Sequence, residues 1–467
     1  MSGPALAYSY FYPFESILGK IDELSGAKGR SASSQSGLQL ATFHERQGTP
    51  YFFQGELVEP FVVAKHLQAL VYYVRTRFHE YLDAATRALA DPIITAHEDF
   101  LRFEVFSGCC SVYARVDLPP EAIRGQTLGC GTTNVDFNPT MVAALGKVRA
   151  SDRLNFSVGA DEFVLEKLQD RVVEKKVQLP LRWLKGLVAA TVYGEKLECQ
   201  HEISAAHATR FLRSLPRNPD KRSRWYVQRA GTSLRMSQRK SPQSVASGGI
   251  HRLRALEDLV RFAKCLRVYG SDDVEASGWE LDCGKMRFSL IMTHDVWRGF
   301  SGEGQGLEAM TSDLPKRVQT GTQRLLKWQS MIDPSDTKTK LSEQELASGL
   351  AQMASQGKVG FDMASGYFFH RELPFDLDMV AKLQPRLRSA QKLLGKNCVQ
   401  QRSNRENQFD VKSTDTTHVV QLTADGIKCT CPWYAKHRNG RGPCKHILAV
   451  QMHLNQRESV TQNGTSE

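Results

Sequence analysis

The sequence predicts an α+β protein of several domains that ends in a small ββα metal-binding module. Three observations support this prediction. The chain has 467 residues, which is too long for one ordinary core. Segments with helical spacing of apolar residues alternate with segments rich in β-branched and aromatic residues. Towards the C-terminus, three cysteines and a histidine lie in two tight pairs with basic residues between them.

The composition is that of a folded protein that works in water. Hydrophobic residues make up 41% of the chain and charged residues 24%, the usual balance of a globular domain. No apolar run approaches the length of a membrane span, which needs about 18 residues. The first residues include a glutamate and no basic segment, so we expect no signal peptide. Ten cysteines in a chain of this kind indicate reduced thiols and a cytoplasmic location.

Residues 1–213 are predicted to form an N-terminal α+β domain. Residues 61–90 have helical periodicity with an apolar stripe. Residues 101–120 alternate between apolar and polar and are rich in β-branched and aromatic residues, so we expect one or two strands closed by prolines.

Residues 214–249 contain prolines, glycines, serines and most of the excess positive charge. Between Arg210 and Arg254 there are twelve Lys or Arg residues and one acidic residue, a net charge of +11 that equals the net charge of the whole chain. We expect a basic linker or a long basic loop here. A concentration of charge of this kind indicates a negatively charged partner.

Residues 250–410 are predicted to form a second α+β domain. Residues 278–293 have the pattern of a β-hairpin. Ser342 and Glu345 have capping-box spacing, which predicts a helix that begins near Glu343. A hairpin is expected over 358–373. Helix followed by hairpin occurs in winged-helix domains and in many other α+β domains.

Residues 411–455 are predicted to form the metal-binding module. The turn sequence Asp425–Gly426 favours a tight hairpin, and the apolar spacing after residue 446 indicates a helix. The local order is therefore strand, strand, loop, helix. Residues 456–467 are polar, and we expect a disordered tail.

The two pairs suit a structural zinc ion. Residues i and i+2 of a strand face the same side, so Cys429 and Cys431 can direct both sulfurs to one ion. Cys444 and His446 lie where the predicted helix begins. Thiolate and imidazole ligands suit tetrahedral zinc, and four protein ligands leave no position for a catalytic water. The other candidates for the fourth ligand are His437, His418 and His453.

This pattern resembles the SWIM zinc finger, in which C-x-C and C-x-H follow a β-hairpin. The resemblance covers about 415–455. It implies one zinc ion bound by the three cysteines and His446. SWIM domains accompany transposases, helicases, recombination factors and ubiquitin-pathway proteins, and are thought to bind DNA or protein. The chain is also similar to bacterial SWIM-finger proteins of unassigned role, some of them encoded near AAA+ ATPases of the MoxR type.

Basic and aromatic residues next to one another favour nucleic acid as a partner, since guanidinium groups bind phosphates and aromatic rings stack on bases. Alternatively, the residues at 221–240 form a solvated loop, and the charges near the zinc ligands offset the negative charge of a three-thiolate centre. The candidate nucleic-acid contacts are Arg222, Arg224, Trp225, Arg239, Lys240, Lys436, Arg438, Arg441 and Lys445.

Three classes of function fit these observations. The leading hypothesis is a zinc-binding protein that binds nucleic acid as part of a larger assembly. The second is a protein adaptor or scaffold, for example for an AAA+ ATPase. The third is an enzyme whose site in 1–410 carries no familiar motif. We assign no catalytic residue. The glycine-rich stretch 297–310 lacks the spacing of a phosphate-binding loop and is better explained by close backbone packing.

Overall fold

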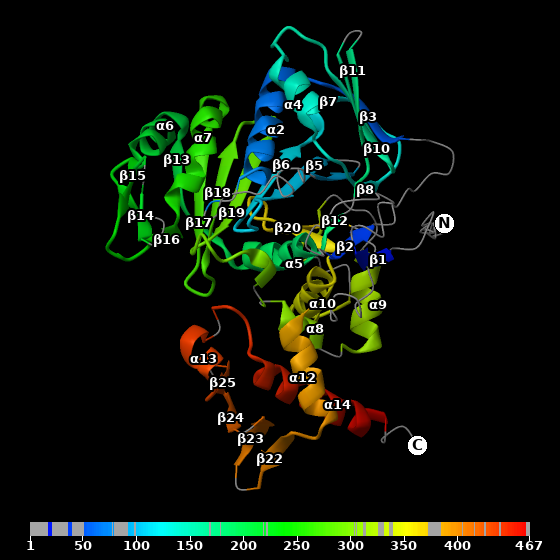
Figure 1. The fold of residues 1–467 in the computed structure, drawn as a ribbon, viewed down its shortest axis with the longest axis vertical. Coiled ribbons are helices and arrows are strands. Elements are labelled where there is room, and N and C mark those ends of the chain that lie inside the picture. The colour runs from blue at the N-terminus through cyan, green and yellow to red at the C-terminus, as the bar shows by residue number, and fades with distance from the viewer. Residues whose placement is uncertain are drawn as a thin grey trace.

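The computed structural model describes residues 17–20, 36–39, 51–76, 78, 92–97, 100–167, 170–177, 179–217, 219–220, 223–302, 304, 306–311, 314–325, 331–335, 340–371, 384–403, 405–414, 416–424, 426–438 and 440–463. Antiparallel sheets and helices form a large body, and a smaller C-terminal unit projects from it (Figure 1). The predicted α+β class is confirmed. No helix in these ranges is both long enough and apolar enough to cross a membrane.

A sheet of eight antiparallel strands forms the centre of the body, in the order β13-β17-β18-β19-β6-β5-β4-β8. Its strands are β4 (Ile93–Ala96), β5 (Leu101–Phe106), β6 (Val112–Leu118), β8 (Gly131–Asn134), β13 (Glu198–Ser204), β17 (Cys265–Gly270), β18 (Ala276–Asp282) and β19 (Arg287–Thr293). The pairing of β19 with β6 joins segments that we expect in separate domains, 1–213 and 250–410. The arrangement differs from that division because pairing between distant strands is not visible in local sequence patterns.

Helices cover both faces of this sheet. Helix α2 (Pro60–Val74) lies against β5 and β6, and its Tyr73 ring packs on Phe288 of β19. Helix α5 (Leu181–Lys196) lies near Ile291 of the same strand. Phe288 and Ile291 are three residues apart, so they face opposite sides of the sheet.

A second antiparallel sheet packs beside the first, in the order β11-β10-β9-β3-β7. Phe103 of β5 packs on Phe156 and Phe163 of this sheet, so the two sheets share one core. The elements here are β3 (Tyr51–Leu57), η1 (Pro120–Ala122), β7 (Ile123–Thr127), α4 (Pro139–Gly146), β9 (Asn155–Gly159), β10 (Glu162–Lys167) and β11 (Asp170–Lys175). A small sheet contains β1 (Ile17–Lys20), β2 (Ser36–Gln39) and β12 (Leu179–Pro180).

The stretch 214–249 contains a three-stranded sheet where we expect a linker or loop. Its strands are β14 (Arg224–Ala230), β15 (Ser233–Ser237) and β16 (Val245–Gly248). A Cβ atom on Gly248 would lie 1.5 Å from the carbonyl oxygen of His294. The glycine therefore permits the small sheet to dock closely on the central one. The helical elements beside it are α6 (Ala205–Ser214), η2 (Ile250–Arg254), α7 (Ala255–Leu259) and η3 (Val260–Phe262).

The segment 300–371 connects the body to the C-terminal unit. It contains η4 (Phe300–Gly302), α8 (Leu307–Thr311), α9 (Lys316–Leu325), α10 (Glu343–Ser355), β20 (Val359–Asp362) and β21 (Tyr367–His370). The predicted capping box at Ser342 and Glu345 is present. Asp362 attaches the hairpin to the central sheet through Arg115 (2.9 Å) and Arg287 (2.6 Å). Burial opposes ionisation of Asp362, but these arginines keep its pKa below the ordinary value.

The C-terminal unit has its own core. Its elements are α12 (Pro385–Gly395), β22 (Val399–Arg402), β23 (Arg405–Ser413), β24 (Thr416–Thr423), β25 (Gly426–Cys429), α13 (Pro432–His437) and α14 (Lys445–Asn463). Buried side chains of α12, the sheet and α14 form one cluster. The unit thus begins before residue 411, and α14 continues into 456–463, where we expect a disordered tail. Apolar packing on α12 and β22 explains the larger extent of the unit.

Candidate metal centre and basic surface

The four predicted ligands come together because four local features position them. Cys429 is the last residue of β25, which pairs with β24 from Thr423↔Gly426 onwards. Cys431 is the N-cap of α13, and its Sγ accepts the backbone N–H of Tyr434. Cys444 precedes α14, and His446 lies in the first turn of that helix. The turn residue Asp425 lies outside the described residues, but the two strands form the predicted hairpin.

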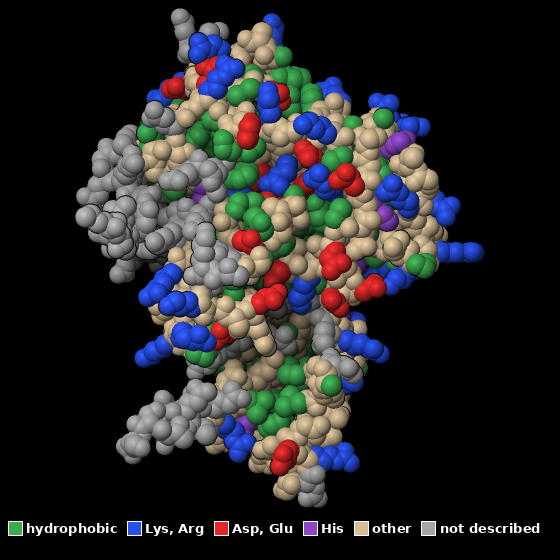
Figure 2. Space-filling view, turned by 180° about the vertical axis from the view of Figure 1, so that it is seen from behind, with side chains coloured by type: hydrophobic (Ala, Val, Ile, Leu, Met, Phe, Trp, Pro, Cys, Tyr) green, Lys and Arg blue, Asp and Glu red, His purple; other side chains and the backbone are tan. Residues whose placement is uncertain are grey.

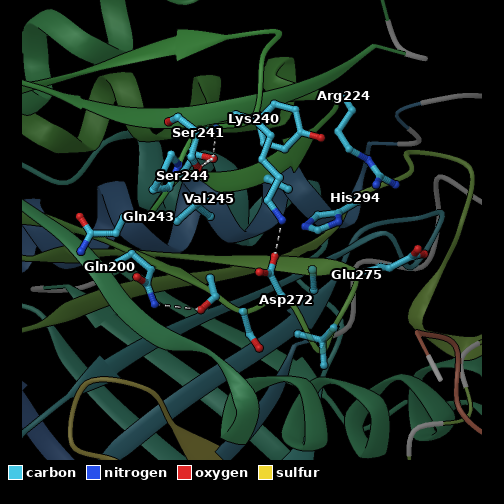
Figure 3. A pocket seen from close by; sticks show the side chains of 17 residues that line it. Gln200, Arg224, Lys240, Ser241, Gln243, Ser244, Val245, Asp272, Glu275 and His294 are labelled. Atoms are coloured by element: carbon cyan, nitrogen blue, oxygen red, sulfur yellow. Dashed lines mark hydrogen bonds and ion pairs between the residues drawn. The ribbon is translucent and has the colours of Figure 1, made fainter. Parts of the chain in front are cut away.

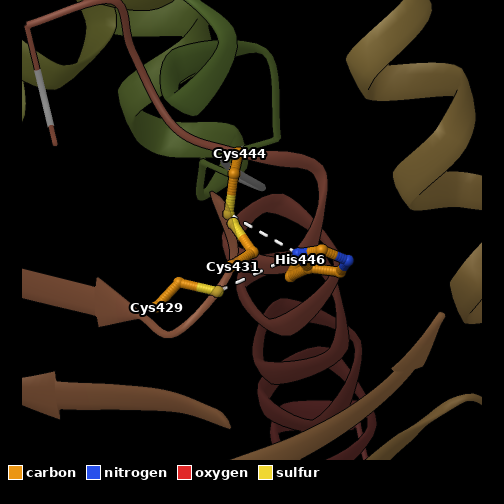
Figure 4. A group of neighbouring side chains, drawn as sticks. All are labelled: Cys429, Cys431, Cys444 and His446. Atoms are coloured by element: carbon orange, nitrogen blue, oxygen red, sulfur yellow. Dashed lines mark hydrogen bonds between the residues drawn. The ribbon is translucent and has the colours of Figure 1, made fainter. Parts of the chain in front are cut away.

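The ligand atoms of Cys429, Cys431, Cys444 and His446 lie within 4.8 Å of one another, and all four side chains are buried (Figure 4). Nδ1 of His446 is 3.9 Å from the sulfurs of both Cys429 and Cys444. A tetrahedral zinc ion with bonds of about 2.0–2.3 Å separates its ligand atoms by roughly 3.5–3.8 Å. The cluster therefore has the size of a zinc site.

The electrostatics of the cluster also favour a cation. Hydrogen bonds from Cys429 and Cys444 lower the pKa of the Cys431 thiol, and the hydrogen bond with Cys431 raises the pKa of Cys429. Thiolates this close repel one another, so one ionised sulfur suppresses ionisation of the next. A divalent ion at the centre offsets that repulsion and allows three thiolates. With His446 as fourth ligand, the site fits one structural zinc ion.

The alternative fourth ligands lie outside the cluster. The ring of His437 packs on Trp433 at 4.6 Å between ring centres. The ring of His418 lies 4.5 Å from the ring of His446 and so packs against the ligand. His453 lies near Phe409, at 6.3 Å between ring centres.

Comparison with known proteins agrees with this geometry. Residues 418–455 match the family model of the SWIM zinc finger. This segment is a SWIM zinc finger. No curated protein sequence matches the chain. Among solved structures, proliferating cellular nuclear antigen from Entamoeba histolytica is similar with a TM-score of 0.36 and 9% identity, over 52% of this chain and 98% of that chain.

The SWIM finger is attached to helix α12 of the C-terminal unit through stacked arginines. The guanidinium carbons of Arg386 and Arg441 lie 4.5 Å and 5.2 Å from the centre of the Trp433 ring. Arg386 also donates hydrogen bonds to the carbonyl oxygens of Arg441 (2.9 Å) and Pro443 (3.0 Å). Sequence reasoning missed Arg386, because no local motif links α12 to the finger.

The predicted contacts of the finger have different environments. Arg441 lies in this stack, and its Nη2 donates to the carbonyl oxygen of Gly302 at 3.4 Å. The glycine-rich stretch 297–310 thus packs against the finger. Lys436 and Arg438 are exposed. Lys445 is half-buried and lines a cavity of about 430 Å³ beside the zinc ligands.

The predicted contacts of the small sheet also differ from one another. Arg224 is exposed at the start of β14. Trp225 is half-buried and, by strand alternation, faces the side opposite to Arg224. Arg239 is exposed, and Lys240 forms an exposed ion pair with Asp272 at 2.9 Å. Arg222 lies outside the described residues. Tyr226, which shares the side of Arg224, lines a cavity with Arg224 and Lys240.

The finger lies next to the rim of that cavity. Cγ of Glu275, a residue of the rim, lies 3.4 Å from the position that a Cβ atom on Gly440 would take. Glu275 is ion-paired with Arg298. Burial and the charges of Arg441 and Arg298 lower the pKa of His437 at the end of α13.

Proposed function

We propose that the chain binds nucleic acid, with the SWIM finger and the sheet β14–β16 forming one contact surface. The observation that carries this proposal is the close approach of Gly440 to Glu275, because it brings the finger next to the cavity that the small sheet lines. The two basic stretches, 223–240 and 436–445, are far apart in the sequence but lie on one side of the molecule (Figure 1).

The side chains of this surface suit phosphates. Arg224, Arg239, Lys436 and Arg438 are exposed, and none of them forms an ion pair within the described part of the chain. Arginine and lysine at such positions contact phosphate oxygens and set the position of a strand. Tyr226 beside Arg224 provides an aromatic ring on the same side of β14, where bases of a single strand could stack.

Acidic side chains interrupt this surface. Figure 2 shows Lys and Arg side chains projecting from the edge at which β14 and β15 lie and from the C-terminal unit, with Asp and Glu side chains between them. Two nearby carboxylates, Asp272 and Glu275, are paired with Lys240 and Arg298. We therefore expect a strand to contact the surface at separate basic positions and not along a continuous groove.

The salt dependence of binding tests this proposal. Five phosphate contacts, from the four exposed residues and Lys240, predict a slope of log K against log salt of about −3.5 on single strands and −4.5 on duplex. The double variant Arg239→Gln, Arg438→Gln changes one residue in each basic stretch and should flatten the single-strand slope by about 1.4. The control Lys147→Gln, Arg149→Gln changes exposed residues near α4 and should leave the slope unchanged.

Fluorescence anisotropy with labelled single-stranded DNA, duplex DNA and RNA gives these slopes. If none of the three bound at about 50 mM salt, the proposal would be wrong. The basic surface would then fit an acidic protein, and the chain would be an adaptor. We also propose a cytoplasmic location, which is supported by ten cysteines that form no disulfide in the described part of the chain.

A further inference from the structure

A cavity of about 800 Å³ lies between the small sheet and the ends of β17, β18 and β19. This volume is in the range of small-molecule sites, about 300–1,000 Å³. Its side chains come from distant segments of the chain (Figure 3). Those that bear on a ligand are Arg224, Tyr226, Lys240, Asp272, Glu275 and His294.

His294 is a buried polar group that lines this cavity without a hydrogen bond of normal geometry. The residue is 7% exposed, and neither ring nitrogen makes a hydrogen bond of normal geometry with the described residues, although the ring interacts with the backbone of Ala276. Burial and the charge of Arg224 lower the pKa of His294 to about 3, so the ring is neutral at pH 7. A buried neutral imidazole has one donor and one acceptor, and leaving them unpaired is unfavourable.

The cations of the cavity are available to an anion. No hydrogen bond or ion pair joins the Arg224 guanidinium group to the described part of the chain. Lys240 is paired with Asp272, but these side chains are 58% and 88% exposed, and exposed pairs contribute little stability. Glu275 is already paired with Arg298. An anion that displaces Asp272 from Lys240 would therefore be bound by two cations.

We propose that this cavity binds the phosphate group of a nucleotide. Arg224 and Lys240 contact the phosphate oxygens, His294 donates a hydrogen bond to the same group, and Tyr226 offers its ring to the base. The nucleotide is either a free mononucleotide or one unit of a strand, since both present the same phosphate. The inference goes beyond the nucleic-acid surface proposed above, with which it shares Arg224 and Lys240.

Isothermal titration calorimetry with AMP and adenosine tests this inference. AMP should bind, and adenosine should bind at least about tenfold more weakly, because a hydrogen bond to a charged group corresponds to tenfold or more in affinity. Arg224→Gln should weaken AMP binding about 10- to 100-fold for the same reason. Asp272→Asn should strengthen it, because Lys240 loses a competing carboxylate. The control Arg149→Gln changes an exposed residue outside the cavity lining and should leave AMP binding unchanged.

Three results would overturn the inference: no AMP binding at about 1 mM, equal affinity for adenosine and AMP, or AMP affinity unchanged in both Arg224→Gln and Asp272→Asn. These variants lie at exposed positions, so they do not depend on a change in the core. Displacement of AMP by single-stranded DNA identifies a strand as the source of the nucleotide. A strand that binds without displacing AMP identifies a free nucleotide. AMP binding without any binding of DNA or RNA would sustain this inference while the proposed function fails.

Discussion

Replacing Cys431 with serine should unfold the SWIM finger and leave the body folded. Cys431 is 2% exposed and its sulfur caps α13. Serine is itself a preferred N-cap residue, so the change removes the zinc ligand and leaves a group that can cap the helix. Zinc contributes about 10–16 kcal/mol to the folding of small zinc modules. A whole domain is stable by only about 5–15 kcal/mol. Losing even half of the metal's contribution is therefore comparable with the stability of the unit.

The structure also predicts how far the unfolding extends. The three ligand cysteines share one core cluster with Leu387 of α12, Val399 of β22 and Leu307 of α8. The central sheet belongs to a separate cluster. We therefore expect 399–450 to lose protection against hydrogen exchange together with α12, while β5, β6 and β19 keep theirs.

Two measurements check this prediction. Elemental analysis should give one zinc per chain for the unaltered protein and much less for Cys431→Ser. Hydrogen exchange followed by mass spectrometry should show the loss of protection in the C-terminal unit alone. Cys398→Ser, which changes a free thiol of the same unit outside the cluster, is the control and should keep both the zinc and the protection. A Cys431→Ser protein with one tightly bound zinc and native protection over β24–α14 would refute the reasoning.

Three further predictions concern stability. Arg386→Met should lower the stability of the C-terminal unit by about 1–3 kcal/mol, because it leaves buried carbonyl groups unpaired. The control Arg388→Met changes an exposed position of the same helix and should not lower the stability. Chemical denaturation of the two variants checks this. Burial raises the pKa of Glu174 from 4.5 to about 7, so the folded protein loses stability as the pH rises between these values. Glu174→Gln should therefore stabilise the protein by about 1–3 kcal/mol at pH 8 and hardly at pH 5. Equal gains in stability at both pH values would contradict this. Gly248→Ala should detach the small sheet, because the added methyl group would overlap the carbonyl of His294; trypsin should then cut early within 224–240, and unchanged digestion would show that the close approach is unimportant.

Features with local causes could be predicted from the sequence alone. The C-x-C and C-x-H pairs next to a hairpin predict the zinc cluster, because zinc requires four such ligands. The predicted cause differs in one detail: strand β25 ends at Cys429, and Cys431 reaches the cluster as the N-cap of α13 and not as the next residue on the same side of a strand. The helix at Glu343 follows from the capping box, because Ser342 and Glu345 satisfy backbone groups only three residues away. The concentration of positive charge in 214–249 is likewise evident from composition.

Only the tertiary structure decided which fold the charged stretch 214–249 adopts and where its side chains lie. Turn residues and charge in 214–249 predict a loop, yet three short strands form there, because pairing with one another and close docking at Gly248 supply contacts that composition does not encode. Strand alternation places Trp225 on the side of β14 opposite to Arg224, and it places Tyr226 on the same side as Arg224. The cavity joins Lys240 to His294, and the stack on Trp433 joins α12 to the finger. Such sites form where two segments that are distant in the sequence have surfaces complementary in shape and charge. The sequence of one segment does not show which other segment will pack against it.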